Sequence, residues 1–185
     1  MCAFLVFSGA HVGAAGAEET DGDGTAWLER DYPYLIVDQS LSGALREFGR
    51  NLGIATEISA KVRGRVRRYE HEGSSSDFLN YLVSAHGIDW VYDRGRLVIS
   101  STDDRVDRTW SAGTGAEVVT KNALEQAGID DPRYPVGFDS GQGMLHLSAP
   151  PRYVALAAPV IERMLTPATT RTVNVIHGRA RDGGT

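Results

Sequence analysis

Residues 74–100, SSSDFLNYLVSAHGIDWVYDRGRLVIS, hold the clearest folding signal in this chain of 185 residues. Ser74 and Asp77 have capping-box spacing, in which each side chain accepts a hydrogen bond from the backbone N–H of the other residue. The apolar residues that follow recur at helical spacing: Phe78, Leu79, Leu82 and Ala85. Gly87 can adopt the left-handed conformation that ends a helix. The stretch therefore begins with a capped amphipathic helix.

The second half of this stretch predicts two short strands. The β-branched and aromatic residues of 90–92 and 97–99 favour extended structure. They are separated by Asp93, Arg94 and Gly95, and Gly95 can supply the positive φ that a tight turn requires. A helix followed by a hairpin in 27 residues predicts an α+β fold.

The residues upstream follow the same pattern. Residues 32–37 include Pro33 and predict an edge strand. Ser40 can cap a helix that Gly53 ends, and its apolar face consists of Leu41, Ala44, Leu45, Phe48 and Leu52. Residues 54–58 then predict another strand. Residues 27–102 therefore predict one compact α+β unit.

Residues 61–68, KVRGRVRR, alternate basic with small or apolar residues. As a strand they place four cations on one face, Lys61, Arg63, Arg65 and Arg67. No aromatic residues interleave, which argues against a nucleic-acid or acidic-lipid patch. A solvated edge that discourages wrong pairing, or a patch for an acidic neighbour, is the favoured interpretation.

A second unit repeats the arrangement after a polar stretch, residues 103–112, that is interpreted as a linker. Thr114 and Glu117 have capping-box spacing, and Gly128 closes the predicted helix. Strands are expected at 136–138 and 144–148. A final helix is expected from the proline pair at 150–151 to about Leu165, with a kink at Pro159.

The N-terminus resembles a secretory signal peptide, because the apolar residues 1–17 end in a small-x-small site followed by acidic residues. Residues 18–26 are acidic and glycine-rich, which predicts a flexible leader. Cys2 is the one cysteine and lies inside the expected signal. The exported chain is therefore expected to use neither disulfides nor thiolate ligands.

Composition and motifs argue against nucleic-acid binding, metal binding, nucleotide binding and nucleophilic catalysis. The net charge of -5 disfavours nucleic-acid binding. The histidines lack metal-site spacing, and no G-x-S-x-G nucleophile motif occurs. Gly113 and Gly115 lack the third glycine of a phosphate loop. The aromatics could stack a sugar, but core and edge packing is favoured. The sequence predicts no catalytic, metal or cofactor site.

The ordered combination of these features resembles the N-terminal periplasmic region of type III secretion secretins. The features are residues 27–34, 41–66 and 77–100 for a first ring domain, and 115–165 for a second. The resemblance implies a short secretin N-terminal domain of the kind shared with TonB receptors, followed by a KH-like domain. Residues 171–182 resemble the strand with which a full secretin begins its next portion.

The expected segments are a signal peptide at 1–17, a leader at 18–26, a first domain at 27–102, a linker at 103–112, a second domain at 113–166 and a tail at 167–185. Because no outer-membrane barrel follows in this sequence, the chain is similar to the split secretins of rhizobia, of the nodulation-protein NolW type. The resemblance implies export to the periplasm of a Gram-negative bacterium, in association with the outer membrane.

The implied function is structural and non-enzymatic. The two units would line the periplasmic vestibule as a homo-oligomeric or mixed ring, alongside a separate barrel protein, and dock inner-membrane ring proteins during effector export. The candidate interaction residues are Lys61, Arg63, Arg65 and Arg67, with Asp103 and Asp104 as a surface of opposite sign. A free-standing periplasmic signalling domain, like that of TonB-dependent receptors, is the alternative.

Overall fold

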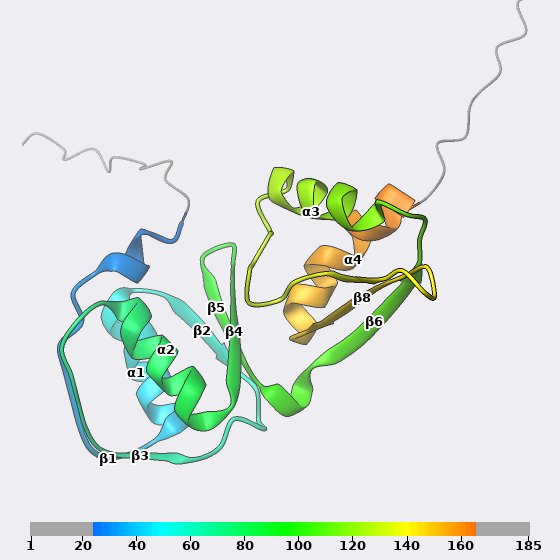
Figure 1. Cartoon of the computed structure of the whole chain (residues 1–185). Helices are drawn as coiled ribbons and strands as arrows, with labels where there is room; N and C mark the ends of the chain where they lie inside the picture. Colours follow the sequence, from blue (N-terminus) through cyan, green and yellow to red (C-terminus); the bar gives the residue numbers. More distant parts are fainter. Residues whose placement is uncertain (1–23, 166–185) are drawn as a thin grey trace, which may run out of the picture.

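The computed structural model describes residues 24–165, which form two units that follow one another along the chain (Figure 1). Each unit has its own hydrophobic core. The first unit contains η1 (Ala26–Glu29), β1 (Tyr34–Ser40), α1 (Leu41–Leu52), β2 (Ala55–Ile58), β3 (Arg65–His71), α2 (Ser75–His86), β4 (Ile88–Asp93) and β5 (Arg96–Ser101). The second unit contains β6 (Val106–Ser111), α3 (Ala116–Gln126), β7 (Gly137–Asp139), β8 (Met144–Ala149) and α4 (Pro151–Leu165). A 3-10 turn, η2 (Thr102–Asp104), joins them. The α+β fold class is confirmed.

The helices of the first unit begin and end at the predicted residues. Ser40 accepts a hydrogen bond from the backbone N–H of Gly43, and α1 ends at Gly53 with a φ of 72°. Ser74 and Asp77 form the complete capping box of α2, which ends at Gly87 with a φ of 59°. These caps satisfy backbone groups that a helix terminus leaves without partners.

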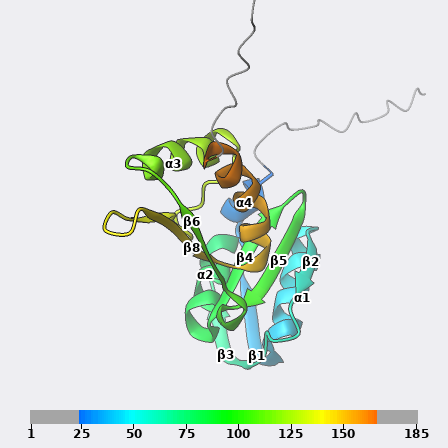
Figure 2. The ribbon, with the colours of Figure 1, turned by 90° about the vertical axis from the view of Figure 1, so that its right-hand side faces the viewer.

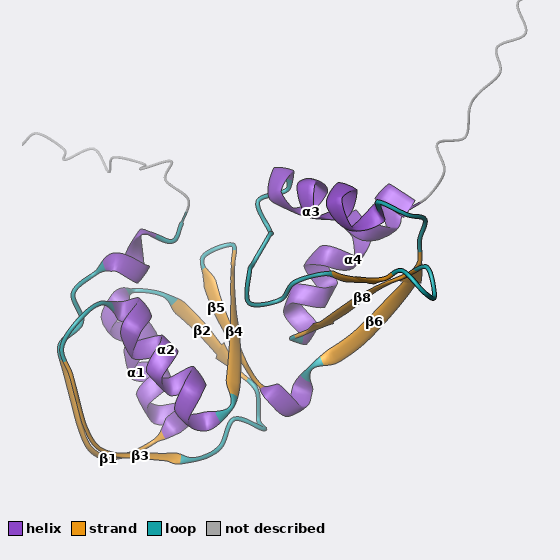
Figure 3. Ribbon diagram, viewed as in Figure 1, coloured by secondary structure: helices purple, strands orange, loops and turns teal. Residues whose placement is uncertain are grey.

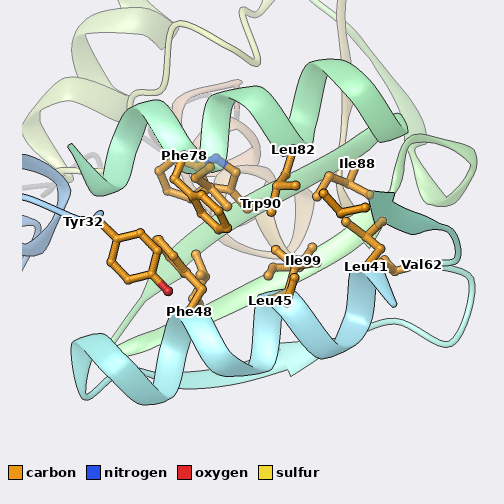
Figure 4. Packing of buried hydrophobic residues seen from close by; sticks show 14 of the residues in the cluster. Tyr32, Leu41, Leu45, Phe48, Val62, Phe78, Leu82, Ile88, Trp90 and Ile99 are labelled. Carbon is orange, nitrogen blue, oxygen red and sulfur yellow. The ribbon is translucent and has the colours of Figure 1, made fainter. Parts of the chain in front are cut away.

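Two sheets frame these helices. One is the antiparallel pair β1–β3, which bends around one end of the unit in both views (Figures 1 and 2). The other has the order β2-β5-β4, with β2 parallel and β4 antiparallel to β5. Its hairpin turns at Gly95, with a φ of 77°. Helices α1 and α2 lie across the face of this sheet that carries the first core (Figure 4).

Aromatic side chains dominate the first core. Phe48 of α1 and Phe78 of α2 stack with ring centroids 5.3 Å apart. Trp27 packs edge-on against both Phe48 and Trp90. Tyr32 contacts the rings of Phe48 and Phe78, with its centroid 5.0 Å from each. Burying each large side chain stabilises the fold by about 1.5–3 kcal/mol before entropy is counted. Core packing of the aromatics, which the sequence favours over sugar stacking, is confirmed for Trp27, Tyr32 and Trp90.

The second unit is a sheet of order β6-β8-β7, with α3 and α4 packed together on it. The stretch 103–112 is not a linker, which corrects the sequence interpretation: most of it is β6, paired along its length with β8 (Figure 3). The strand was not predicted because the stretch is mostly polar. Only alternate residues, Val106 and Trp110 among them, pack against the second core.

Three other boundaries differ from expectation. The capping box at Thr114 and Glu117 does not form, because Gly115 takes the N-cap position with a φ of 82° and the helix has no side-chain cap. The basic strand begins at Arg65 rather than Lys61. The edge strand is shifted by two residues and begins at Tyr34. Helix α4 continues across Pro159 to Leu165. The expected signal peptide and tail lie outside the described residues.

Candidate interaction surfaces

The two surfaces of opposite sign that the sequence singles out meet within one chain. Lys61 Nζ lies 2.7 Å from an oxygen of Asp104. The hydroxyl of Ser59 donates to the other oxygen of Asp104 at 2.7 Å. The hydrogen bond from Lys61 is the largest of several effects that lower the pKa of the Asp104 carboxyl. Lys61 and Asp104 therefore already neutralise each other, while Asp103 remains exposed in the same turn.

Asp38 on the neighbouring strand faces the arginines of β3. Arg65 Nε donates to Asp38 Oδ1 at 2.9 Å, and Arg67 Nε lies 3.5 Å from the same oxygen. The hydrogen bond from Arg65 is the main cause of a lowered pKa for Asp38. Arg63 donates to the backbone oxygen of Ala60. Of the predicted cations, Arg65 and Arg67 thus lie on the exposed β1–β3 ribbon opposite Asp38, whereas Lys61 and Arg63 precede β3.

The ribbon also exposes apolar side chains that the sequence interpretation missed. Leu35 and Val37 of β1 are 66% and 73% exposed, while Ile36 between them is buried. Among the described strands, β1 pairs with β3 alone. Successive strand residues point to opposite faces. Three consecutive apolar residues in an edge strand, Leu35-Ile36-Val37, cannot all face the core. The sequence therefore contained a signal that apolar side chains would be exposed on one face of this strand.

Contacts between the two units hold them in one arrangement. Arg105, between η2 and β6, binds Asp89 of β4 through two hydrogen bonds of 2.7 and 2.8 Å. Asp89 is buried. Arg152 at the start of α4 pairs with Asp93 at the end of β4. The second unit therefore binds both ends of β4 through charged pairs.

Aromatic contacts reinforce this junction. The guanidinium of Arg133 lies 3.6 Å from the ring centroid of Trp90, within cation–π range. The buried hydroxyl of Tyr134 donates to the Trp90 backbone oxygen at 3.0 Å, and burial is the main cause of a raised pKa for Tyr134. Val91, from the first unit, belongs to the second core. Together these contacts join the two units along β4.

A cleft of about 890 Å³ remains beside this junction. Its charged side chains include Asp93, which pairs with Arg152, and Asp131, which pairs with Arg133 at 2.6 Å. Within residues 24–165, no group of three His, Cys, Asp or Glu side chains is placed to hold a metal ion. The paired charges are typical of a structural contact between domains.

The described helices include none with the length and hydrophobicity needed to cross a membrane. No protein-family model matches the chain. The chain is 36% identical over 154 residues to the nodulation protein NolW of Rhizobium fredii, covering 83% of this chain and 66% of the relative. It is 30% identical over 138 residues to the type 3 secretion system secretin of Xanthomonas euvesicatoria. This chain is a homologue of NolW and of the type III secretion secretins.

The match spans 75% of this chain but 23% of the Xanthomonas secretin, and the NolW proteins are also longer than the matched region. The resemblance to the secretin family is therefore confirmed for this N-terminal region.

Solved structures show the same fold. A chain of the Salmonella InvGN0N1:SpaPQR:PrgHK assembly aligns with a TM-score of 0.57 and 19% identity, over 72% of this chain and 93% of that one. A chain of the Salmonella SPI-1 injectisome basal body, which contains InvG, PrgH and PrgK, also gives a TM-score of 0.57. Both units of this homologue are thus arranged as in a secretin N-terminal region.

Proposed function

We propose that this protein is a non-enzymatic component of the outer-membrane secretin of a type III protein secretion system. Its two units would form part of the periplasmic ring and dock the inner-membrane part of the machine. The likeness to NolW, named as a nodulation protein, supports a role in effector export during nodulation. The observation that carries the proposal is the arrangement of both units, which aligns with 93% of the Salmonella chain in the InvGN0N1 assembly.

The segment boundaries form part of this proposal. Residues 1–17 would direct export, and 18–26 would link the cleaved N-terminus to a first domain at 27–102. The second domain would occupy 113–166, although β6 already begins its sheet at Val106. The tail at 167–185 would lead toward the portion that a separate barrel protein supplies. The mature chain would then reside in the periplasm, in association with the outer membrane.

The junction between the units supports a role in assembly. An oligomeric ring requires each subunit to present its contact surfaces at a fixed angle, because a rotation that does not close produces a filament. The Arg105–Asp89 pair and the Arg133–Trp90 contact fix that angle within one subunit. The exposed β1–β3 ribbon, with its arginines and with Leu35 and Val37, remains available to a neighbour.

Co-purification from cells tests the proposal. We expect the tagged chain to retain both the barrel protein and the inner-membrane ring proteins. Replacing Arg63, Arg65 and Arg67 by glutamate should abolish retention of at least one of them, because the ribbon would change sign. Deleting the chain should also stop effector secretion. Retention of neither partner by the native chain, together with normal secretion after deletion, would refute the proposed function.

A matched variant separates docking from folding. The triple reversal leaves Asp38 among new carboxylates, so Asp38→Arg is added to restore the ion pairs with opposite polarity. This fourfold variant should fold and still fail to retain the partner. A control with the same charge change elsewhere, R46E/R108E, should retain it. Equal retention by the fourfold variant and the control would remove the arginine ribbon from the proposal while leaving the secretin assignment intact.

A further inference from the structure

A small groove lies between the start of α3 and the end of α4. It has a volume of about 380 Å³ and is lined by residues 113–116, Val119, Thr120, Met164 and Leu165. Val119 and Met164 are 49% and 43% exposed, and Val118 beside them is 63% exposed. Large exposed apolar side chains gathered at one place typically mark a binding surface. This groove is a part of the second unit that the proposed function does not use.

Some polar groups at the groove also lack partners among the described residues. Thr120 is 1% exposed, yet its Oγ1 has no hydrogen-bond partner among the described residues. Helix α3 begins at Gly115 without a side-chain cap; the N–H of Ala116 donates to the Gly113 oxygen, whereas those of Glu117 and Val118 have no such acceptor among the described residues. Buried polar groups in folded proteins are nearly always paired. The groove therefore calls for an occupant that carries both apolar side chains and free backbone polar groups.

The chain itself supplies such a segment next to the groove. Leu165, which lines the groove, is followed by seven residues and then by Val173. Seven extended residues reach about 23 Å, whereas the 11 residues of α3 span about 16 Å. Residues 171–176 read RTVNVI, so in an extended conformation Val173 and Val175 share one face. Arg171 carries the charge opposite to that of Glu117, which is exposed in the first turn of α3.

We propose that residues 171–176 dock in the α3–α4 groove as an extended segment. Val173 and Val175 cover Val119 and Met164, and the segment backbone supplies partners for Thr120 and for the first turn of α3. Arg171 lies near Glu117. The inference does not depend on the proposed function, because it concerns a contact within one chain.

Disulfide trapping in the full chain tests this contact. With Cys2 replaced by serine, the pair V119C/V173C should form an intramolecular disulfide in dilute protein, because docking brings the two Cβ atoms within bonding reach. The matched control is K121C/V173C, since Lys121 lies on the other side of α3. We expect the control to oxidise at least ten-fold more slowly, as measured on non-reducing gels and by intact mass.

Two outcomes would overturn the proposal. Equal oxidation rates for the two pairs would show that the segment does not dock. Covalent dimers from V119C/V173C would assign the groove to a second copy of the chain. In either case the co-purification described above would still decide the proposed function separately.

Hydrogen exchange provides a second readout that needs no cysteines. In the native chain, amides of residues 171–176 should exchange at least ten-fold more slowly than a freely accessible peptide. V119D should remove that protection, and V173D/V175D should raise exchange in the first turn of α3. Unchanged exchange in α1 and α2 would show that the variants remain folded. Exchange of residues 171–176 at the free-peptide rate in the native chain would contradict the docking.

Discussion

At the scale of single residues, Lys61 and Asp104 form an ion pair between two segments that are far apart in the sequence. Asp104 receives hydrogen bonds from Lys61, Ser59 and the backbone of Ser101. Each of these contacts favours the ionised carboxylate and lowers its pKa, and desolvation opposes them with an effect smaller than that of the hydrogen bonds from Lys61 and Ser59. The pair closes the turn between the two units. Its charges therefore interact with each other within one chain.

The lowered pKa of Asp104 predicts a dependence of stability on pH. Because the unfolded chain binds the proton more readily, this carboxylate stabilises the fold at pH values above the ordinary aspartate pKa of about 3.9. That contribution is lost as pH falls through the lowered native value. We expect Asp104→Asn to reduce the free energy of unfolding at pH 6 and to flatten its decline on acidification, as measured by urea denaturation.

Asp103→Asn provides the control, because Asp103 lies one residue away in the same turn and acts on Lys61 only at longer range, whereas Asp104 forms the ion pair. It should leave the acid dependence close to that of the native chain. A D104N variant whose unfolding free energy falls with acid as steeply as that of the native protein would contradict the assignment.

At the scale of elements, the packing of α1 against β2 depends on a glycine. Gly49 is buried in the last part of α1, and a methyl group added there would meet the side chain of Thr56 and lie 2.9 Å from the backbone oxygen of Ile54. The close approach lets the chain turn from α1 into β2 within the few residues that separate them. A side chain at this position would push the helix away from the strand.

Gly49→Ala should therefore destabilise the protein by about 1–3 kcal/mol, the usual cost of overpacking a well-filled core. The gain in helix propensity, about 1 kcal/mol, offsets part of that cost. Urea denaturation measures the change. Adding Thr56→Ala should recover part of the loss by removing the nearest contact, and a G49A variant at least as stable as the native chain would show that the strand moves freely.

At the scale of the whole molecule, charged and aromatic contacts join the two units. Each unit has its own core and is small, so each is only marginally stable alone. The contacts of Arg133 and Tyr134 with Trp90 tie the second unit to the first. We expect the native chain to unfold in one cooperative thermal transition, because the loss of one unit exposes apolar surface of the other.

Replacing Arg133 by alanine and Tyr134 by phenylalanine should uncouple the units. The Trp90 carbonyl loses its donor and the ring loses its cation, so calorimetry should resolve two transitions in place of one. Arg46→Ala, on the exposed face of α1, should keep the single transition. A single sharp transition in R133A/Y134F would show that the junction does not couple the units.

Local signals made much of the fold predictable from the sequence. Ser40 with Gly53, and Ser74 with Gly87, define α1 and α2 because a helix cap involves residues within one turn of the helix end. The hairpin at Gly95 is local for the same reason. These elements establish the α+β class, and the ordered motifs that contain them carry the resemblance to secretins that the homologues confirm.

Tertiary structure decided what depends on partners distant in sequence. Strand β6 forms because β8 supplies its hydrogen bonds. The polar residues 103–112 contain no local pattern from which this pairing could be predicted. Likewise, folding brings Lys61 and Asp104 together as an ion pair and places the Arg133 guanidinium over the Trp90 ring. The reason is physical: a cap or turn is stabilised by neighbours along the chain, whereas a strand pair or an ion pair acquires its energy only when folding brings separated residues together.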